Sequence, residues 1–156
     1  MSECHNHTHC IETVFAQAED ICEKRNIRLT PIRKYVLGLI WHSHHGVKAY
    51  DLLDKIKDFD ASSKPPTIYR SLDFLLENGL IHKIHSHNLY VGCMHPLSHR
   101  DCIFLICHQC FAVTEACNTH IHALLGDITT QHHFKAVHQM IEISGLCRTC
   151  NQTLHS

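Results

Sequence analysis

Two pairs of cysteines with the spacing Cys-x-x-Cys lie in the C-terminal half of the chain. Cys107 and Cys110 form the first pair, and Cys147 and Cys150 form the second. Each pair is predicted at a turn beside a strand. Four thiolates from two such pairs complete a tetrahedral zinc shell that has no open coordination position, which is typical of a structural site. The pattern therefore predicts a structural zinc.

A redox-active cysteine pair is the competing interpretation of this spacing. The segment between Cys110 and Cys147 holds 36 residues, which is longer than the usual zinc-ribbon spacing. Zinc remains favoured because the two pairs occur together, and because no strand-helix-strand pattern of the thioredoxin kind surrounds them.

A second set of metal-binding side chains is more dispersed. It consists of His82, Cys93, His95, His99 and Glu115. His82 is expected on a strand and Cys93 just after the next one, whereas Glu115 belongs to the C-terminal half, so a shared metal would join two domains. These are the borderline and soft ligands that zinc accepts, and a thiolate among them argues against magnesium and calcium and, less strongly, against ferrous iron.

The composition restricts the classes of protein to consider. The chain has 156 residues, 44% of them hydrophobic, with ten cysteines and a formal charge of −1. It can bury a core, and a nucleic-acid partner would have to bind a local basic patch such as residues 24–34. Neither a membrane span nor a secretory leader is predicted. We therefore expect a cytoplasmic protein, whose clustered cysteines bind metal rather than form disulfides.

The first half of the chain is predicted to be mainly helical. Apolar spacing predicts a helix over residues 13–25, and Thr30 with Pro31 predicts the start of a second one. A third helix begins near Ala49. A fourth follows the loop at residues 60–64 and ends at Asn78-Gly79. On this fourth helix Arg70 lies about 200° from the buried Ile68, so its side chain is available to a partner.

Alternating polarity over residues 80–93 predicts a two-stranded hairpin. Three short helices closed by such a hairpin favour a winged helix-turn-helix over a generic helical bundle. Near Gly92 the predicted pattern changes from helices and a hairpin to strand-like runs with Cys-x-x-Cys pairs, which suggests a domain boundary there. Beyond it we predict strands at 102–107, 112–117 and 134–144 and a helix at 120–132.

Several of these motifs resemble the ferric uptake regulator family, and within it the zinc-sensing members. The resemblance covers about residues 13–150 in collinear order. It rests on the motifs RLTPIRKYVL, AYDLLD, KPPTIYRSLDFLLENGLIHKI, NLYVGC, CHQCFAVTE and GLCRTC.

The resemblance implies an α+β protein with an N-terminal winged helix-turn-helix DNA-binding domain and a C-terminal α/β dimerisation domain. We place a disordered Cys/His-rich leader at residues 1–12, the DNA-binding domain at 13–92 and the dimerisation domain at 93–156. The implied function is a zinc-responsive repressor that binds a palindromic operator as a homodimer and controls zinc uptake genes. Each chain would hold two zinc ions, one structural and one regulatory.

The resemblance also implies roles for individual residues. The structural zinc ligands would be Cys107, Cys110, Cys147 and Cys150. The regulatory zinc ligands would be His82, Cys93, His99 and Glu115, with His95 as the substitute for His99 because the spacing between Cys93 and Cys107 departs from the family pattern. The residues that face DNA would be Tyr50, Tyr69 and Arg70.

Two other functions stay open from the sequence. A repressor of the same fold could sense iron, manganese or peroxide, although the histidine-rich run typical of iron and peroxide sensors is missing from this region. A zinc-dependent hydrolase or deaminase is the enzyme alternative. It would need an open coordination position and a placed general base, and neither HExxH nor the HxE with PCxxC pairing occurs in the chain.

Overall fold

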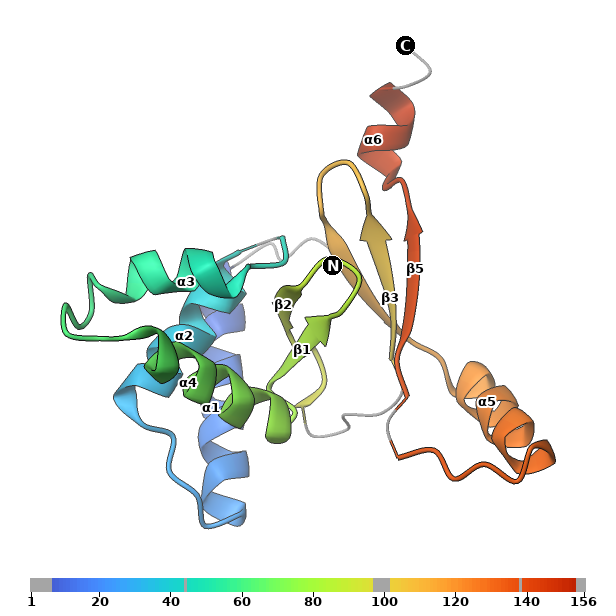
Figure 1. Ribbon diagram of the computed structural model, residues 1–156, viewed down its shortest axis with the longest axis horizontal. Helices are drawn as coiled ribbons and strands as arrows, with labels where there is room; N and C mark the ends of the chain where they lie inside the picture. Colours follow the sequence, from blue (N-terminus) through green and yellow to red (C-terminus); the bar gives the residue numbers. More distant parts are fainter. Residues whose placement is uncertain (1–6, 44, 97–101, 138, 154–156) are drawn as a thin grey trace. The chain divides into compact units, whose positions relative to one another are not determined.

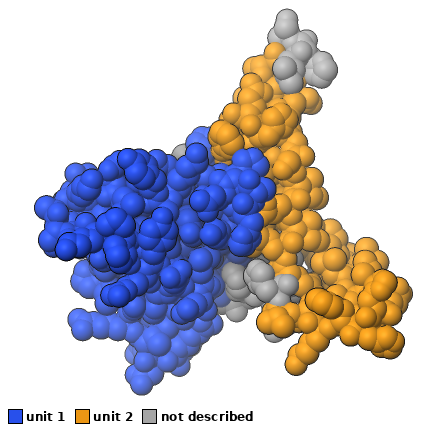
Figure 2. Space-filling model, in the orientation of Figure 1, with its two compact units in different colours: residues 1–98 blue, residues 99–156 orange. Residues whose placement is uncertain are grey.

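The computed structural model describes residues 7–43, 45–96, 102–137 and 139–153, and the structural statements below concern these residues. The chain divides into two compact units, residues 1–98 and 99–156, which are drawn in different colours in Figure 2. Helices dominate the first unit and a sheet with short helices makes the second, as the predicted α+β class requires. Each unit is described by itself.

The first helix, α1 (His7–Lys24), begins six residues before its predicted start. The apolar stripe extends toward the N-terminus by one more turn, because Ile11 is buried together with Val14 and Ala18. This corrects the disordered leader predicted for residues 1–12, whose last six residues are helical. Cys4 and His5, in the other half of the leader, lie outside the described residues.

Three more helices complete the core of the first unit (Figure 1). They are α2 (Pro31–His42), α3 (Ala49–Ile56) and α4 (Pro65–Glu77). Pro31 and Pro65 occupy first-turn positions, where the missing N–H costs nothing. One hydrophobic cluster joins the helices, and its fully buried members include Leu37, Leu52 and Leu72.

The turn between α3 and α4 is fixed by one acidic side chain. The Asp60 carboxylate accepts hydrogen bonds from the Ser62 hydroxyl at 2.7 Å and the Ser62 backbone amide at 2.9 Å, and from the Ser63 hydroxyl at 3.1 Å. These hydrogen bonds from Ser62 and Ser63 lower the pKa of Asp60. The turn thus holds the start of α4 at a defined place relative to α3.

A two-stranded hairpin follows α4, as predicted. Strands β1 (Ile81–Ile84) and β2 (Leu89–Gly92) pair antiparallel, with His82 opposite Val91. The loop after α2 adds one bridge, because the backbone N–H and C=O of Val47 both bond to Tyr90, at 2.9 and 2.8 Å. The hairpin is therefore attached to the helical core along β2.

The second unit is built on a three-stranded sheet with the order β4-β3-β5. Strand β3 (Cys102–Cys107) pairs antiparallel with β4 (Val113–Cys117) and parallel with β5 (Ile141–Gly145). Between β4 and β5 runs α5 (Thr119–Gln131), where the Asn118 side chain accepts the His120 amide at 2.9 Å as an N-cap.

Two features of the second unit differ from the prediction. The strand expected over residues 134–144 is paired only from Ile141 onward, because only this part reaches the edge of β3. A short helix, α6 (Arg148–Thr153), was not predicted, since its six residues carry no apolar stripe and none of them is buried. No helix in the described part of the chain is long and apolar enough to cross a lipid bilayer.

Candidate metal centres and DNA-binding surface

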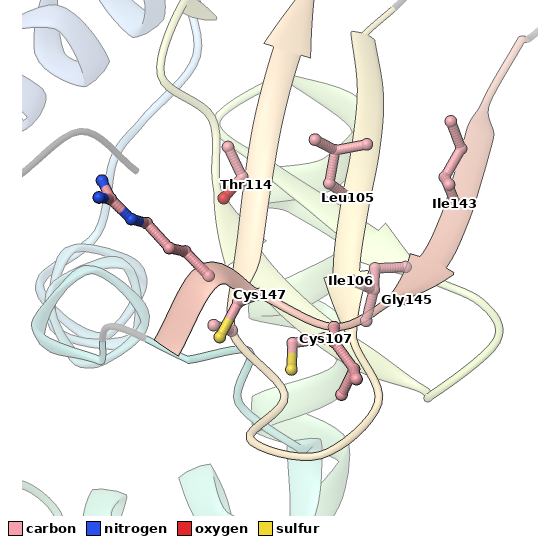
Figure 3. Close-up of a pocket in the computed structure, with 10 residues that line it drawn as sticks. Leu105, Ile106, Cys107, Thr114, Ile143, Gly145 and Cys147 are labelled. Atoms are coloured by element: carbon pink, nitrogen blue, oxygen red, sulfur yellow. The ribbon is translucent and has the colours of Figure 1, made fainter. Parts of the chain in front are cut away.

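The sheet of the second unit brings its two cysteine pairs together. Cys107 ends β3, Cys110 lies in the turn after it, and Cys147 and Cys150 follow β5, which is parallel to β3. Because parallel neighbours end at the same edge, both pairs lie at one end of the sheet, as Figure 3 shows for the sulfur atoms of Cys107 and Cys147. The four Sγ atoms all lie within 4.8 Å of one another.

This geometry fits zinc. Four sulfurs at a zinc–sulfur distance of about 2.3 Å form a tetrahedron whose edges are about 3.8 Å. The Sγ atoms of Cys110 and Cys147 are 3.8 Å apart. The four thiols are not joined as disulfides either, so the redox interpretation gains no support from the structure.

Backbone amides and neighbouring thiols shift the pKa values of Cys107 and Cys150 in opposite directions. Backbone amides of Cys110 and Cys147 donate to Cys107 and lower the pKa of its thiol to about 6. The thiol of Cys147 raises the pKa of Cys150 to about 12, and burial adds to this rise. The thiolate of Cys107 thus forms readily. Cys150, which lies beside other thiols, needs a positive charge nearby before it ionises.

The turn that carries the first pair has a specific backbone shape. The Cys107 amide donates to the Ala112 carbonyl at 2.9 Å, and the Phe111 amide donates to the Cys107 carbonyl, also at 2.9 Å. Phe111 has a φ of 58°, which closes the turn in the left-handed region. The turn points the thiol of Cys110 back toward Cys147.

Two members of the second donor set lie in the first unit. His82 on β1 is 7% exposed, and Cys93, directly after β2, is 1% exposed. The hairpin brings their ligand atoms within 4.8 Å of each other. The Cys93 amide donates to the Leu80 carbonyl at 3.0 Å, which extends the hairpin past β2 and fixes the backbone that carries the thiol.

The remaining members of this set belong to other parts of the chain. Glu115 lies on β4 of the second unit and is half-buried. His95 is exposed in the segment after β2, and His99 lies outside the described residues. A histidine, a thiol and a carboxylate form a donor set that suits zinc. The chain therefore carries two donor sets that are consistent with two zinc sites.

The predicted DNA-facing residues lie on the first two turns of α3 and α4. Arg70 is exposed and directly follows the half-exposed Tyr69, while Ile68 before them and Leu72 after them are fully buried. Tyr50, in the first turn of α3, is 70% exposed. The ring and hydroxyl of Tyr50 are therefore available to a partner.

The second unit also presents an open apolar surface. A hollow of about 390 Å³ lies over the sheet, lined by Leu105, Thr114 and Ile143 among others (Figure 3). Leu105 and Ile143 are 42% and 50% exposed. Helix α5 projects from the sheet in Figure 1 and leaves Leu124 and Ile128 largely exposed. Sequence patterns did not locate this surface, because exposure of an apolar residue is not visible from its spacing.

A winged helix-turn-helix in one unit, and a four-cysteine centre on a separate α/β unit, define a metal-dependent DNA-binding regulator. Comparison with known proteins agrees: residues 24–144 match the model of the ferric uptake regulator family. The chain belongs to this family. As a member it is a transcription regulator and not an enzyme, which removes the hydrolase alternative.

Individual relatives are more specific. The chain is 42% identical over 141 residues to the zinc uptake regulation protein of Escherichia coli (strain K12), covering 89% of this chain and 82% of that protein. It is 38% identical to a zinc uptake regulator solved in complex with zinc and DNA, with a TM-score of 0.88, covering 94% of this chain and 98% of that one. The holo form of XcZur is 39% identical, with a TM-score of 0.83 over 91% of this chain and 99% of that one.

Proposed function

We propose that this protein is a zinc-responsive transcriptional repressor, which binds a palindromic operator as a homodimer, uses zinc as its co-repressor and controls genes for zinc uptake. The observation that carries the proposal is the coexistence of two different zinc donor sets with an exposed Arg70 on α4, which would be the recognition helix. One set is closed and suits permanent binding. The other has ligands in both units and suits regulation. Such a repressor acts in the cytoplasm.

The four cysteines would hold the structural zinc. Four thiolates leave no position for water or substrate, and a closed site contributes directly to folding. The small core of the second unit supports this role. Its described and buried apolar side chains are few, and they come mainly from β3, namely Ile103, Phe104 and Ile106. The structural zinc would supply the stability that this core lacks.

The regulatory zinc would bind His82, Cys93 and Glu115, with His99 as the fourth ligand or His95 in its place. His82 and Cys93 belong to the hairpin and Glu115 to β4, so an ion bound to all of them favours one arrangement of the two units over others. The thiol favours zinc over iron or manganese. If that arrangement also places the two recognition helices of the dimer in successive major grooves, operator affinity rises with zinc.

A homodimer would cover the apolar surface of the second unit. The large exposed apolar side chains of this unit are Leu105, Phe111, Leu124, Ile128, Phe134, Val137 and Ile143. A monomer that left such a set in water would risk aggregation, whereas a second copy can cover it with the same set. Two-fold symmetry of the protein then requires a palindromic operator.

Arg70 is the residue that we expect to read the operator. In the zinc-loaded dimer, Arg70→Ala should fold and dimerise normally, because its side chain points away from the buried stripe of Ile68 and Leu72. Loss of a bidentate contact to guanine O6 and N7 should weaken specific binding by about 1–3 kcal/mol, or roughly 5- to 150-fold, and relax the preference at one base pair. A mobility-shift titration at fixed salt measures this.

Arg70→Lys is the matched control, because lysine keeps the charge but lacks the planar fork of donors that matches guanine O6 and N7. It should lose base preference like the alanine variant while it retains more of the overall affinity. Unchanged operator affinity in Arg70→Ala would show that this helix position does not contact DNA, and would remove the proposed reading mode.

A further inference from the structure

The only tryptophan of the chain, Trp41, lies in the last turn of α2 and packs against the backbone of Gly92. A Cβ atom placed on Gly92 would lie 2.3 Å from Cε2 and 2.4 Å from Nε1 of the indole. A Cβ atom essentially never comes this close to another side chain. The indole ring cannot easily move aside, because it packs against the core. Gly92 does not have a positive φ. This glycine therefore serves close approach and not an unusual backbone conformation.

The contact lies next to both zinc donors of the first unit. Gly92 is the last residue of β2 and the register partner of Ile81, so it stands beside His82 across the hairpin. The residue after Gly92 is Cys93, whose amide is bonded to the Leu80 carbonyl. The indole thus packs against the short stretch of backbone that positions the thiol.

The same helix also contacts the recognition helix. Near the N-terminus of α2, the Arg33 guanidinium lies 3.6 Å from the centroid of the Phe74 ring on α4. At the C-terminus of α2, Trp41 contacts Gly92. One helix therefore connects the zinc-binding end of the hairpin with the helix that carries Arg70.

The size of the indole matters more than its polar group. Trp41 Nε1 is buried and has no hydrogen-bond partner among the described residues. A buried donor without a partner costs stability, which phenylalanine at this position would avoid. The advantage of tryptophan here is therefore the packing of its larger ring against the backbone of Gly92.

We infer that Trp41 and Gly92 form a matched pair that positions Cys93 for zinc, which makes Trp41 a positioning residue of the regulatory site. The inference rests on the proposed function, since it takes Cys93 as a zinc ligand. Metal–ligand distances must hold to within about 0.2 Å, so a shift of this backbone by the width of a methyl group misplaces the thiol.

The test is a double-mutant cycle on the full-length dimer with its structural zinc in place. Affinity for the second zinc is measured by competition with a chelator for Gly92→Ala, Trp41→Ala and the double variant. Gly92→Ala should bind this zinc about 10- to 100-fold more weakly than the wild type. This is the range for substitution of residues that orient metal ligands without binding the metal. Trp41→Ala should bind this zinc more weakly than the wild type but more tightly than Gly92→Ala, and the double variant should recover to the level of Trp41→Ala, because the clash is gone.

Gly46→Ala separates positioning from general destabilisation of the hairpin. A Cβ on Gly46 would lie 2.7 Å from the Leu89 Cβ, at the other end of β2 from Cys93. This variant should lower the unfolding temperature yet keep zinc affinity. Equal loss of zinc affinity in Gly46→Ala and Gly92→Ala would overturn the inference, and so would wild-type affinity in Gly92→Ala or no recovery in the double variant.

Cys93→Ala and the wild type complete the experiment. Cys93→Ala should lose the second zinc whatever stands at positions 41 and 92; if it keeps this zinc, the proposed regulatory site itself fails, which is a different result from a failed cycle. In the wild type, Trp41 fluorescence should change as the second zinc binds, and Cys93→Ala should abolish the change. Binding of this zinc without any change in emission would also contradict the role of Trp41.

Discussion

Cys107→Ser and Cys150→Ser should each abolish the folded dimer. The described part of the second unit buries few large side chains, so its own core contributes little. Structural zinc in small domains contributes about 10–16 kcal/mol of apparent binding free energy, which is as large as the total stability of a typical domain, about 5–15 kcal/mol. Removal of one thiolate leaves three ligands and an open position. We therefore expect loss of zinc, of the dimer and of much of the sheet.

Zinc content, size-exclusion chromatography and circular dichroism measure these three losses. Cys22→Ala is the matched control, because Cys22 is a buried thiol of the first unit and its raised pKa, caused by burial, marks a neutral thiol. The control should keep its zinc and its dimer at a modest cost in stability. A Cys107→Ser protein that purifies as a well-folded dimer with normal zinc content would show that the four cysteines are not a structural site.

Single substitutions at the regulatory site should leave the fold intact and remove the response to zinc. His82→Ala, Cys93→Ala and Glu115→Ala should each bind about one zinc fewer per chain and keep the zinc of the four cysteines. Coupling free energies between a ligand site and a second site are typically about 1–3 kcal/mol. Operator affinity at saturating zinc should therefore fall roughly 5- to 150-fold, toward the value of the zinc-depleted protein.

The same titrations identify the fourth ligand. If His99 binds zinc, His99→Ala should behave like Cys93→Ala, while His95→Ala should behave like the wild type; the reverse pattern assigns the ligand to the exposed His95. A normal zinc response in both His82→Ala and Cys93→Ala would eliminate the regulatory site.

Features that depend on neighbours in the sequence could be predicted from it. The Cys-x-x-Cys spacing, the prolines in the first turns of α2 and α4, and the alternation in the hairpin all act within a few residues. Arg70 could be placed on the outer face of α4 because Ile68 and Leu72 define the inner one, and both are fully buried. The family resemblance added the roles of Tyr50 and Tyr69, which no local pattern shows.

Features that depend on distant contacts could not be predicted. The sequence around Gly92 indicates only a change of pattern, because nothing near it in the chain shows that the ring of Trp41 packs on its backbone. Only partners across the sheet fix the start of β5 at Ile141. Helix α6 is too short and too exposed to leave a periodic pattern. His99 lies outside the described residues, so its role stays a prediction.

The dependence of operator binding on zinc tests the central claim most directly. A promoter fragment that contains the palindromic operator is titrated with protein in which only the four-cysteine site is loaded, at increasing free zinc, and in parallel with ferrous and manganous ions. We predict that zinc raises operator affinity roughly 5- to 150-fold as one further ion binds per chain, and that the operator tightens zinc binding by the same factor. Ferrous and manganous ions should have little effect at matched concentrations, because the ligand set includes a thiolate. Operator binding that is independent of zinc, or that responds equally to iron or manganese, would contradict the account.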